Sequence, residues 1–162
     1  MPSHTVSKAK NHIRRTLWEL VDRAPSKADV ARLWRHFNSE CAYCGKPLDK
    51  KVRNGHIDHL DANRSVNRNH ISNRVLACNI CNGDEKREND WEKFLAQKCG
   101  EDVAACVIRT SRIREWQQQC GIPPEIDAAI IAEVDRAVQE CNAKLDQECN
   151  RIRQLLSKPG RT

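Results

Sequence analysis

CAYC at residues 41–44 and CNIC at residues 78–81 form two Cys-x-x-Cys pairs, separated by 33 residues. A Cys-x-x-Cys turn supplies two thiolates to one metal ion, and zinc accepts four thiolates in a tetrahedron. Gly45 directly follows the first pair, Gly83 lies two residues after the second, and both suit tight backbone turns. The spacing therefore predicts a structural zinc site, which holds the fold of this region and performs no chemistry. Its predicted ligands are Cys41, Cys44, Cys78 and Cys81.

The segment between the two cysteine pairs carries side chains suited to phosphodiester hydrolysis. Asp58 and His59 are adjacent in a strand-like stretch, so their side chains should point to opposite faces. Hydrolysis of a phosphodiester needs a base that activates water and a hard cation that stabilises the developing negative charge. A histidine beside a carboxylate at a strand end can provide the base and one ligand of the cation.

The order of these residues resembles the HNH endonuclease family: Asp58 and His59, then Asn73, then Asn82, framed by the cysteine pairs. The resemblance covers about residues 38–90 and implies a ββα-metal finger of two strands, a loop and a helix. It implies that His59 is the general base and that Asp58 and Asn82 ligate a catalytic Mg²⁺ or Mn²⁺ ion. It further implies that Asn73 orients the loop and the base, and that the products carry 5′-phosphate and 3′-hydroxyl ends.

The sequence departs from the family pattern at three places. Asn82 stands where many members have histidine, although an asparagine oxygen also suits magnesium. Leu60-Asp61-Ala62 replaces the common Ile-x-Pro after the Asp-His pair. A lysine often follows the last motif residue by about three positions, whereas Lys86 follows Asn82 by four.

Each motif residue also has a structural alternative when it is taken alone. Asn82 could cap the following helix, with Glu85 three residues later completing a capping box. His59 could be a surface histidine paired with Asp58, and Asn73 lies in a loop rich in asparagine. The functional interpretation rests on the combination of order, spacing and zinc frame.

The positive charge of the chain lies in its N-terminal three-fifths. Residues 1–98 carry 19 Lys and Arg against 12 Asp and Glu, whereas residues 99–162 carry 9 against 10. A positive surface favours nucleic acid as the partner. We expect DNA, with RNA left open, and little sequence specificity. The predicted nucleic-acid contacts are Arg64, Arg68, Arg74, Lys86 and Arg87.

Helical periodicity flanks the zinc segment on both sides. The predicted fold is mainly α, with a small zinc-bound ββα-metal core and helical N-terminal and C-terminal extensions. We expect three regions: an N-terminal helical segment over residues 1–37, the zinc-bound core over residues 38–98 and a C-terminal helical region over residues 99–162. Helices are predicted over residues 8–22, over residues 26–37 with Ser26 as the cap, from residue 91 onward and over residues 102–118. Strand-like pieces are predicted around Tyr43 and over residues 56–60. The remaining cysteines are predicted to be buried apolar side chains: Cys99, Cys106, Cys120, Cys141 and Cys149.

A long amphipathic helix of about 30 residues is predicted from about Ile130 to Leu156. Such a helix exceeds what a small domain covers. Its apolar stripe is therefore expected either to pack on another chain, as a protein partner or a second copy, or to fold back on residues 8–37 and 102–118.

Membrane and secreted classes do not fit the composition. The longest apolar run has six residues, Val103 to Ile108, whereas a spanning helix needs roughly 20. The N-terminus has no signal-peptide pattern, and we expect a cytoplasmic protein. The leading hypothesis is a metal-dependent DNA endonuclease, the nuclease subunit of a bacterial anti-phage defence complex or a similar assembly. The alternative is a non-catalytic, zinc-ribbon-like nucleic-acid-binding or scaffold protein.

Overall fold

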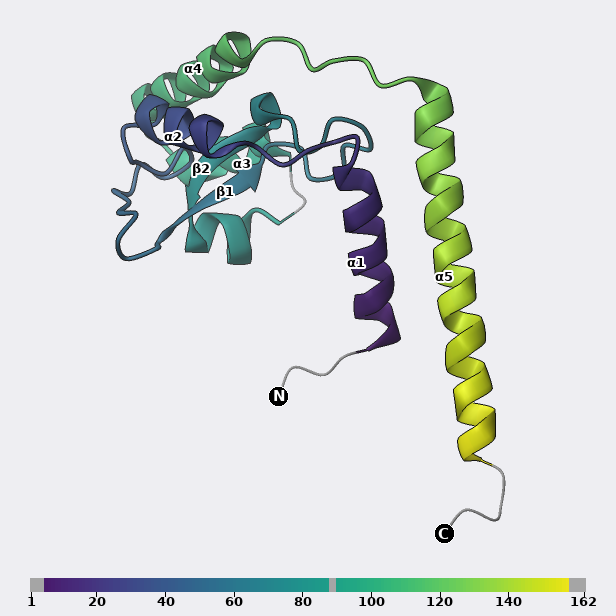
Figure 1. The fold of residues 1–162 in the computed structure, drawn as a ribbon. Coiled ribbons are helices and arrows are strands. Elements are labelled where there is room, and N and C mark those ends of the chain that lie inside the picture. Colours follow the sequence, from purple (N-terminus) through teal and green to yellow (C-terminus); the bar gives the residue numbers. More distant parts are fainter. Residues whose placement is uncertain (1–4, 88–89, 158–162) are drawn as a thin grey trace. The chain divides into compact units, whose positions relative to one another are not determined.

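The computed structural model describes residues 5–87 and 90–157. The chain is mainly helical with one small antiparallel sheet, which confirms the predicted fold class (Figure 1). No helix in the described part of the chain has the length and apolar character needed to cross a membrane. The elements are α1 (Val6–Glu19), α2 (Lys27–His36), β1 (Gly55–His59), the 3-10 turn η1 (Ile71–Asn73), β2 (Arg74–Cys78), the π-helix η2 (Ile80–Glu85), α3 (Trp91–Cys99), α4 (Val103–Cys120) and α5 (Ala128–Leu156).

The chain divides into two compact units, which differ from the boundaries expected at residues 37 and 98. One unit, the helix pair, contains α1 and α5; the other, the core unit, is Asp22–Pro124. Helices α2 and α4 belong to the core unit because their apolar side chains enter the same hydrophobic core as the zinc segment. The residues that do so are Leu33, Trp34, Ile113 and Trp116.

Helix α2 begins as the sequence predicts. The Ser26 hydroxyl accepts a hydrogen bond from the Asp29 backbone N–H at 3.1 Å, and the Asp29 carboxylate accepts one from the Ser26 backbone N–H at 3.2 Å. This capping box satisfies two backbone donors at the helix start. Helix α4 is joined to the sheet region by Trp116, whose indole N–H donates to the Arg74 carbonyl at 2.9 Å. A buried indole needs such an acceptor.

Strands β1 and β2 pair antiparallel, and every residue of β2 is buried. The register places Asp58 opposite Val75 and His59 opposite Arg74, so each of these pairs shares one face of the sheet. The predicted strand over residues 56–60 is confirmed as β1. The strand expected around Tyr43 is wrong, because Tyr43 lies in the turn of the first cysteine pair and its ring is buried in the core.

A π-helix, η2, follows β2 and contains Asn82. The Lys86 backbone N–H donates to the Cys81 carbonyl, five residues back, at 3.1 Å. A π turn holds one more residue than an α turn. Asn82 and Lys86, four residues apart, both lie within this turn. The helix-cap alternative for Asn82 is wrong, because Asn79 is the residue at the start of η2.

In the helix pair, α1 and α5 lie side by side and run in opposite directions (Figure 1). Lys10 and Asp146 form an ion pair between them at 2.5 Å, and Val138 of α5 is buried. The fold-back of α5 on residues 6–19 is therefore observed. Of the five remaining cysteines, which were all expected to be buried, only Cys99 is buried. Cys106, Cys120 and Cys149 are half-buried, and Cys141 is exposed.

Candidate active site and zinc centre

The four predicted zinc ligands converge on one point of the core unit. Their Sγ atoms all lie within 4.8 Å of one another, and Cys44 Sγ is 3.9 Å from Cys78 Sγ. Zinc–sulfur bonds of about 2.3 Å in a tetrahedron place the sulfurs about 3.8 Å apart. The cluster therefore fits a zinc ion. It is the one group of three or more Cys, His, Asp or Glu side chains with this proximity among residues 5–87 and 90–157.

The first cysteine turn is held in place from α4. Arg109 donates to the Tyr43 carbonyl at 3.2 Å, and its guanidinium would lie 2.7 Å from a Cβ atom at position 45. Gly45 also has a φ of +73°, so this position requires glycine for two reasons. The expectation for Gly83 is wrong, because a Cβ atom there would meet no other atom within 4 Å.

The thiols of the cluster do not share one protonation behaviour. A hydrogen bond with Cys81 lowers the pKa of Cys41 to about 5, while burial raises the pKa of Cys44 to about 11. One thiolate among neighbouring thiols is the arrangement expected before a metal ion releases the remaining protons. The case for a metal centre rests on the proximity of the four Sγ atoms.

Asp58 faces the interior of the core unit, on the same side of the sheet as Val75. Its Oδ2 atom accepts a hydrogen bond from the Tyr43 hydroxyl at 2.9 Å and lies 3.2 Å from the Lys86 ammonium. Burial raises the pKa of Asp58, and both neighbours oppose that effect. A divalent ion at Asp58 would meet the Lys86 ammonium. The Oδ2 atom is therefore open to a catalytic ion only after Lys86 has moved.

His59 lies on the other face of β1, beside Arg74. Arg74 Nη1 is 3.2 Å from His59 Nδ1, and the buried His59 Nε2 has no hydrogen-bond partner among the described residues. Burial, together with the charges of Arg74 and Arg68, lowers the pKa of His59 to about 4. The imidazole is therefore neutral near pH 7, and its buried Nε2 atom is left without a partner within the described part of the chain.

A chain of polar contacts that sequence reasoning missed supports Arg74. The buried Asp22 carboxylate accepts the Asn69 backbone N–H at 2.9 Å, and the Asn69 side-chain N–H donates to the Asp22 carbonyl at 2.8 Å. Asn69 Oδ1 in turn accepts from Arg74 Nη2. These contacts fix the guanidinium next to His59. Asp22 is the last residue of the predicted helix over residues 8–22, with no local pattern that would identify its role.

Asn73 organises the loop between the strands. Its side-chain N–H group donates to the carbonyls of Asp61 at 3.0 Å and Arg68 at 2.9 Å, and its oxygen accepts from the Asp61 backbone N–H at 2.9 Å. The Leu60 backbone N–H donates to the Asn73 carbonyl at 2.9 Å, next to His59. The side chain of Asn73 therefore bonds the loop, and its backbone carbonyl bonds the residue after His59. The role of Asn73 in orienting the base stays a prediction.

Asn82 and the basic side chains occupy different environments. Asn82 is half-buried, directly after the zinc ligand Cys81, while Arg68 and Arg87 are exposed and Arg64 is half-buried. Arg74 is buried with its guanidinium directed at His59. The prediction that Lys86 contacts nucleic acid is wrong, because its exposed fraction is 0 % and its ammonium is held inside the protein.

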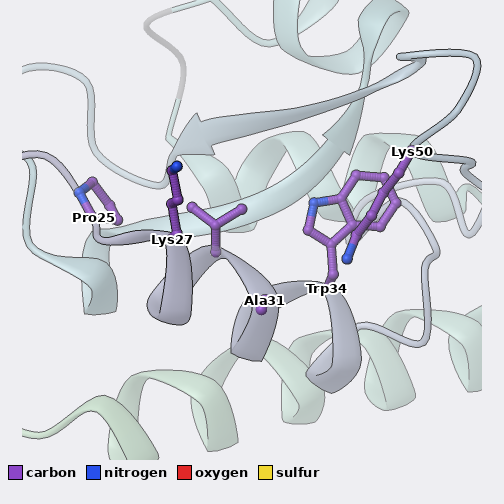
Figure 2. Close-up of a pocket in the computed structure, with 6 residues that line it drawn as sticks. Pro25, Lys27, Ala31, Trp34 and Lys50 are labelled. Carbon is purple, nitrogen blue, oxygen red and sulfur yellow. The ribbon is translucent and has the colours of Figure 1, made fainter.

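A separate hollow of about 400 Å³ lies beside α2, where Lys50 stacks on the Trp34 ring (Figure 2). The ammonium of Lys50 is 5.1 Å from the ring centroid. Its lining contains no acid, histidine or cysteine, so it lacks a candidate base or nucleophile for hydrolysis. The lining residues are Pro25, Lys27, Val30, Ala31, Trp34 and Lys50.

Residues 41–88 match the family model described as HNH endonuclease, which confirms the resemblance found in the motifs. The match spans less than a third of the chain and includes both cysteine pairs, both strands and Asn82. It supports a nuclease-type function with a zinc site, and hence an interaction with nucleic acid. No curated protein matches the sequence.

Proposed function

We propose that the protein is a divalent-metal-dependent endonuclease that hydrolyses phosphodiester bonds of DNA, with His59 as the general base. The observation that carries this proposal is the state of His59 within the HNH-type region. Its imidazole is neutral, one nitrogen is buried without a partner, and a guanidinium lies on the other nitrogen. A base next to a phosphate-binding group is the combination that hydrolysis requires.

The contact between Arg74 and His59 suggests how a substrate phosphate could free a nitrogen of the base. A guanidinium only donates hydrogen bonds, so His59 Nδ1 is the accepting nitrogen and the neutral ring carries its proton on Nε2. A phosphate is a stronger partner for Arg74 than a neutral imidazole. When a substrate phosphate takes the guanidinium, Nδ1 becomes available to accept the proton of the attacking water. Asp22 and Asn69 limit how far Arg74 moves.

A divalent ion, when bound, would stabilise negative charge on the phosphate and on the 3′ leaving oxygen. Asp58 and Asn82 remain the predicted ligands, and both are oxygen donors of the type that Mg²⁺ and Mn²⁺ prefer. The exposed Arg68 and Arg87, with Arg64, would contact backbone phosphates without reading bases. The expected products therefore carry 5′-phosphate and 3′-hydroxyl ends on DNA of any sequence.

A plasmid-cleavage assay in Mg²⁺ and in Mn²⁺ tests the proposal with His59→Ala and a matched control, His56→Ala. His56 lies on the same strand with its side chain exposed. General-base catalysis typically contributes 10²–10⁴-fold, so His59→Ala should lower the rate at least about 100-fold. His56→Ala should retain activity. Unchanged cleavage by a folded, zinc-loaded His59→Ala protein would reject the assignment of the base.

The second candidate is a non-catalytic zinc-stabilised binding module, because Asp58 already has two protein partners, as a structural carboxylate does. DNA binding by gel shift without any cleavage by the wild-type protein would favour it. In the wider role predicted from the sequence, the nuclease would act as a subunit of an anti-phage assembly. The exposed apolar side chains of α5, among them Ile152 and Leu156, would then form its docking face.

A further inference from the structure

Lys86 is the most unusual cation in the described part of the chain, because it is fully buried. Its ammonium donates to the His59 carbonyl at 2.6 Å, lies 3.2 Å from Asp58 Oδ2 and sits 5.8 Å from the centre of the Tyr43 ring. A buried lysine is tolerated only when charged and polar partners surround its ammonium. All three of these partners belong to the neighbourhood of the predicted metal ligand Asp58.

The π-helix η2 places this side chain. Lys86 is the residue directly after η2, and its backbone N–H closes the last π turn on Cys81. The same turn carries Asn82, the second predicted metal ligand. The backbone turn that carries Asn82 therefore also sets the ammonium of Lys86 at the end of β1, against the His59 carbonyl and Asp58.

Two cations cannot occupy one small carboxylate site without strong repulsion, because screening by water is weak inside the protein. Asp58 in turn cannot remain buried as an anion without a counter-charge. The metal-free protein meets this requirement with Lys86. A metal-loaded protein would meet it with the divalent ion.

We propose that Lys86 is the resident cation of Asp58: it neutralises the carboxylate in the metal-free protein, and a divalent ion binds Asp58 by displacing the ammonium from Oδ2. This inference rests on the proposed function, since it assumes that a divalent ion binds Asp58. It makes Lys86 a determinant of metal affinity and not a nucleic-acid contact.

Mn²⁺ binding by the zinc-loaded, full-length protein, measured by electron paramagnetic resonance without DNA, tests the proposal. Lys86→Met removes the ammonium and keeps the aliphatic length, and it should tighten Mn²⁺ binding by at least about tenfold. The matched control is Lys98→Met, whose ammonium pairs with Glu85 at 2.6 Å beside the zinc cluster. That variant should change the affinity by less than about threefold, since it does not touch Asp58.

Asp58→Asn separates a failure of this inference from a failure of the proposed function. If Asp58→Asn abolishes Mn²⁺ binding but Lys86→Met leaves the affinity unchanged or weaker, the resident-cation role is refuted and the metal ligand stands. If Asp58→Asn leaves Mn²⁺ binding intact, both the ligand assignment and this inference are overturned. Tightening by Lys86→Met that disappears in the double variant supports the proposal.

A second measurement avoids variants that lose the buried charge pair and unfold. The ¹⁵Nζ resonance of Lys86 in the wild-type protein, assigned by its absence in Lys86→Arg, is followed during addition of Mg²⁺. Displacement predicts that this resonance shifts or broadens together with the backbone amides of Asp58 and Asn82. Shifts at those amides with an unchanged Lys86 resonance would overturn the proposal.

Discussion

The core unit and the helix pair differ in how many charged and polar side chains they bury. The core unit buries charged and polar side chains, each held by named partners: Asp22, Asp58, Asn73, Arg74 and Lys86. The helix pair buries the apolar Val138 among its described residues, and its ion pairs lie at the surface. A buried polar group costs stability unless it is fully partnered. The contrast therefore favours the core unit as the place of the proposed chemistry.

Loss of a zinc ligand should destabilise the core unit strongly and leave the helix pair nearly unchanged. Cys78→Ser removes one ligand at the end of β2, and a structural zinc contributes roughly 10 kcal/mol to folding. We expect loss of zinc and loss of amide protection in α2, α3 and α4, with α1 and α5 little changed. Zinc analysis and hydrogen exchange measured by mass spectrometry check both parts.

The matched control for this variant is Cys141→Ser, in an exposed position of α5. It should keep the zinc and the protection of both units. A uniform loss of protection in Cys78→Ser would show that the two units fold as one, and would remove the contrast between them.

The features predicted correctly from sequence depend on local patterns. Ser26 and Asp29 carry their capping box within four residues, and the two cysteine pairs specify their own turns. The alternation along β1 placed Asp58 and His59 on opposite faces because it follows from strand geometry alone. Helices α4 and α5 were found from periodicity, which is strongest in long elements.

The features that were missed depend on contacts between distant segments. Nothing near Tyr43 indicates that its hydroxyl meets Asp58, and nothing near Asp22 indicates its bonds to Asn69. Lys86 was misassigned because a lysine is exposed by default, and only the π turn brings it inside. The assignment of α2 and α4 to the core unit likewise depends on side chains that meet in three dimensions.

Within the candidate active site, removal of the Arg74 charge should have a smaller effect, which is a change in the pKa of His59. Arg74→Gln removes a buried positive charge next to His59 and should raise the pKa of His59 from about 4 by roughly one unit. The sign follows because a cation disfavours the protonated imidazole. Burial, the larger cause, remains, so the pKa should stay below the ordinary value of about 6.5. A histidine NMR titration of the zinc-loaded protein without Mg²⁺ measures it.

Arg68→Gln is the control for that titration, because Arg68 is exposed and acts on His59 more weakly than Arg74. Its effect should have the same sign and be smaller. An unchanged or lower pKa of His59 in Arg74→Gln would show that the guanidinium does not govern this base. The role proposed for substrate phosphate in releasing Nδ1 would then fail as well.

The smallest effect is expected at the ion pair between the two helices of the pair. Lys10 and Asp146 are 34 % and 48 % exposed, and exposed pairs contribute about 0–1 kcal/mol. Asp146→Asn should therefore lower the hydrogen-exchange protection of α1 by less than about fivefold. Lys144→Gln, which breaks a pair within α5 alone, is the control and should leave α1 unchanged. Loss of all protection in α1 on Asp146→Asn would mean that a surface ion pair holds the helix pair together, and that apolar packing around Val138 does not.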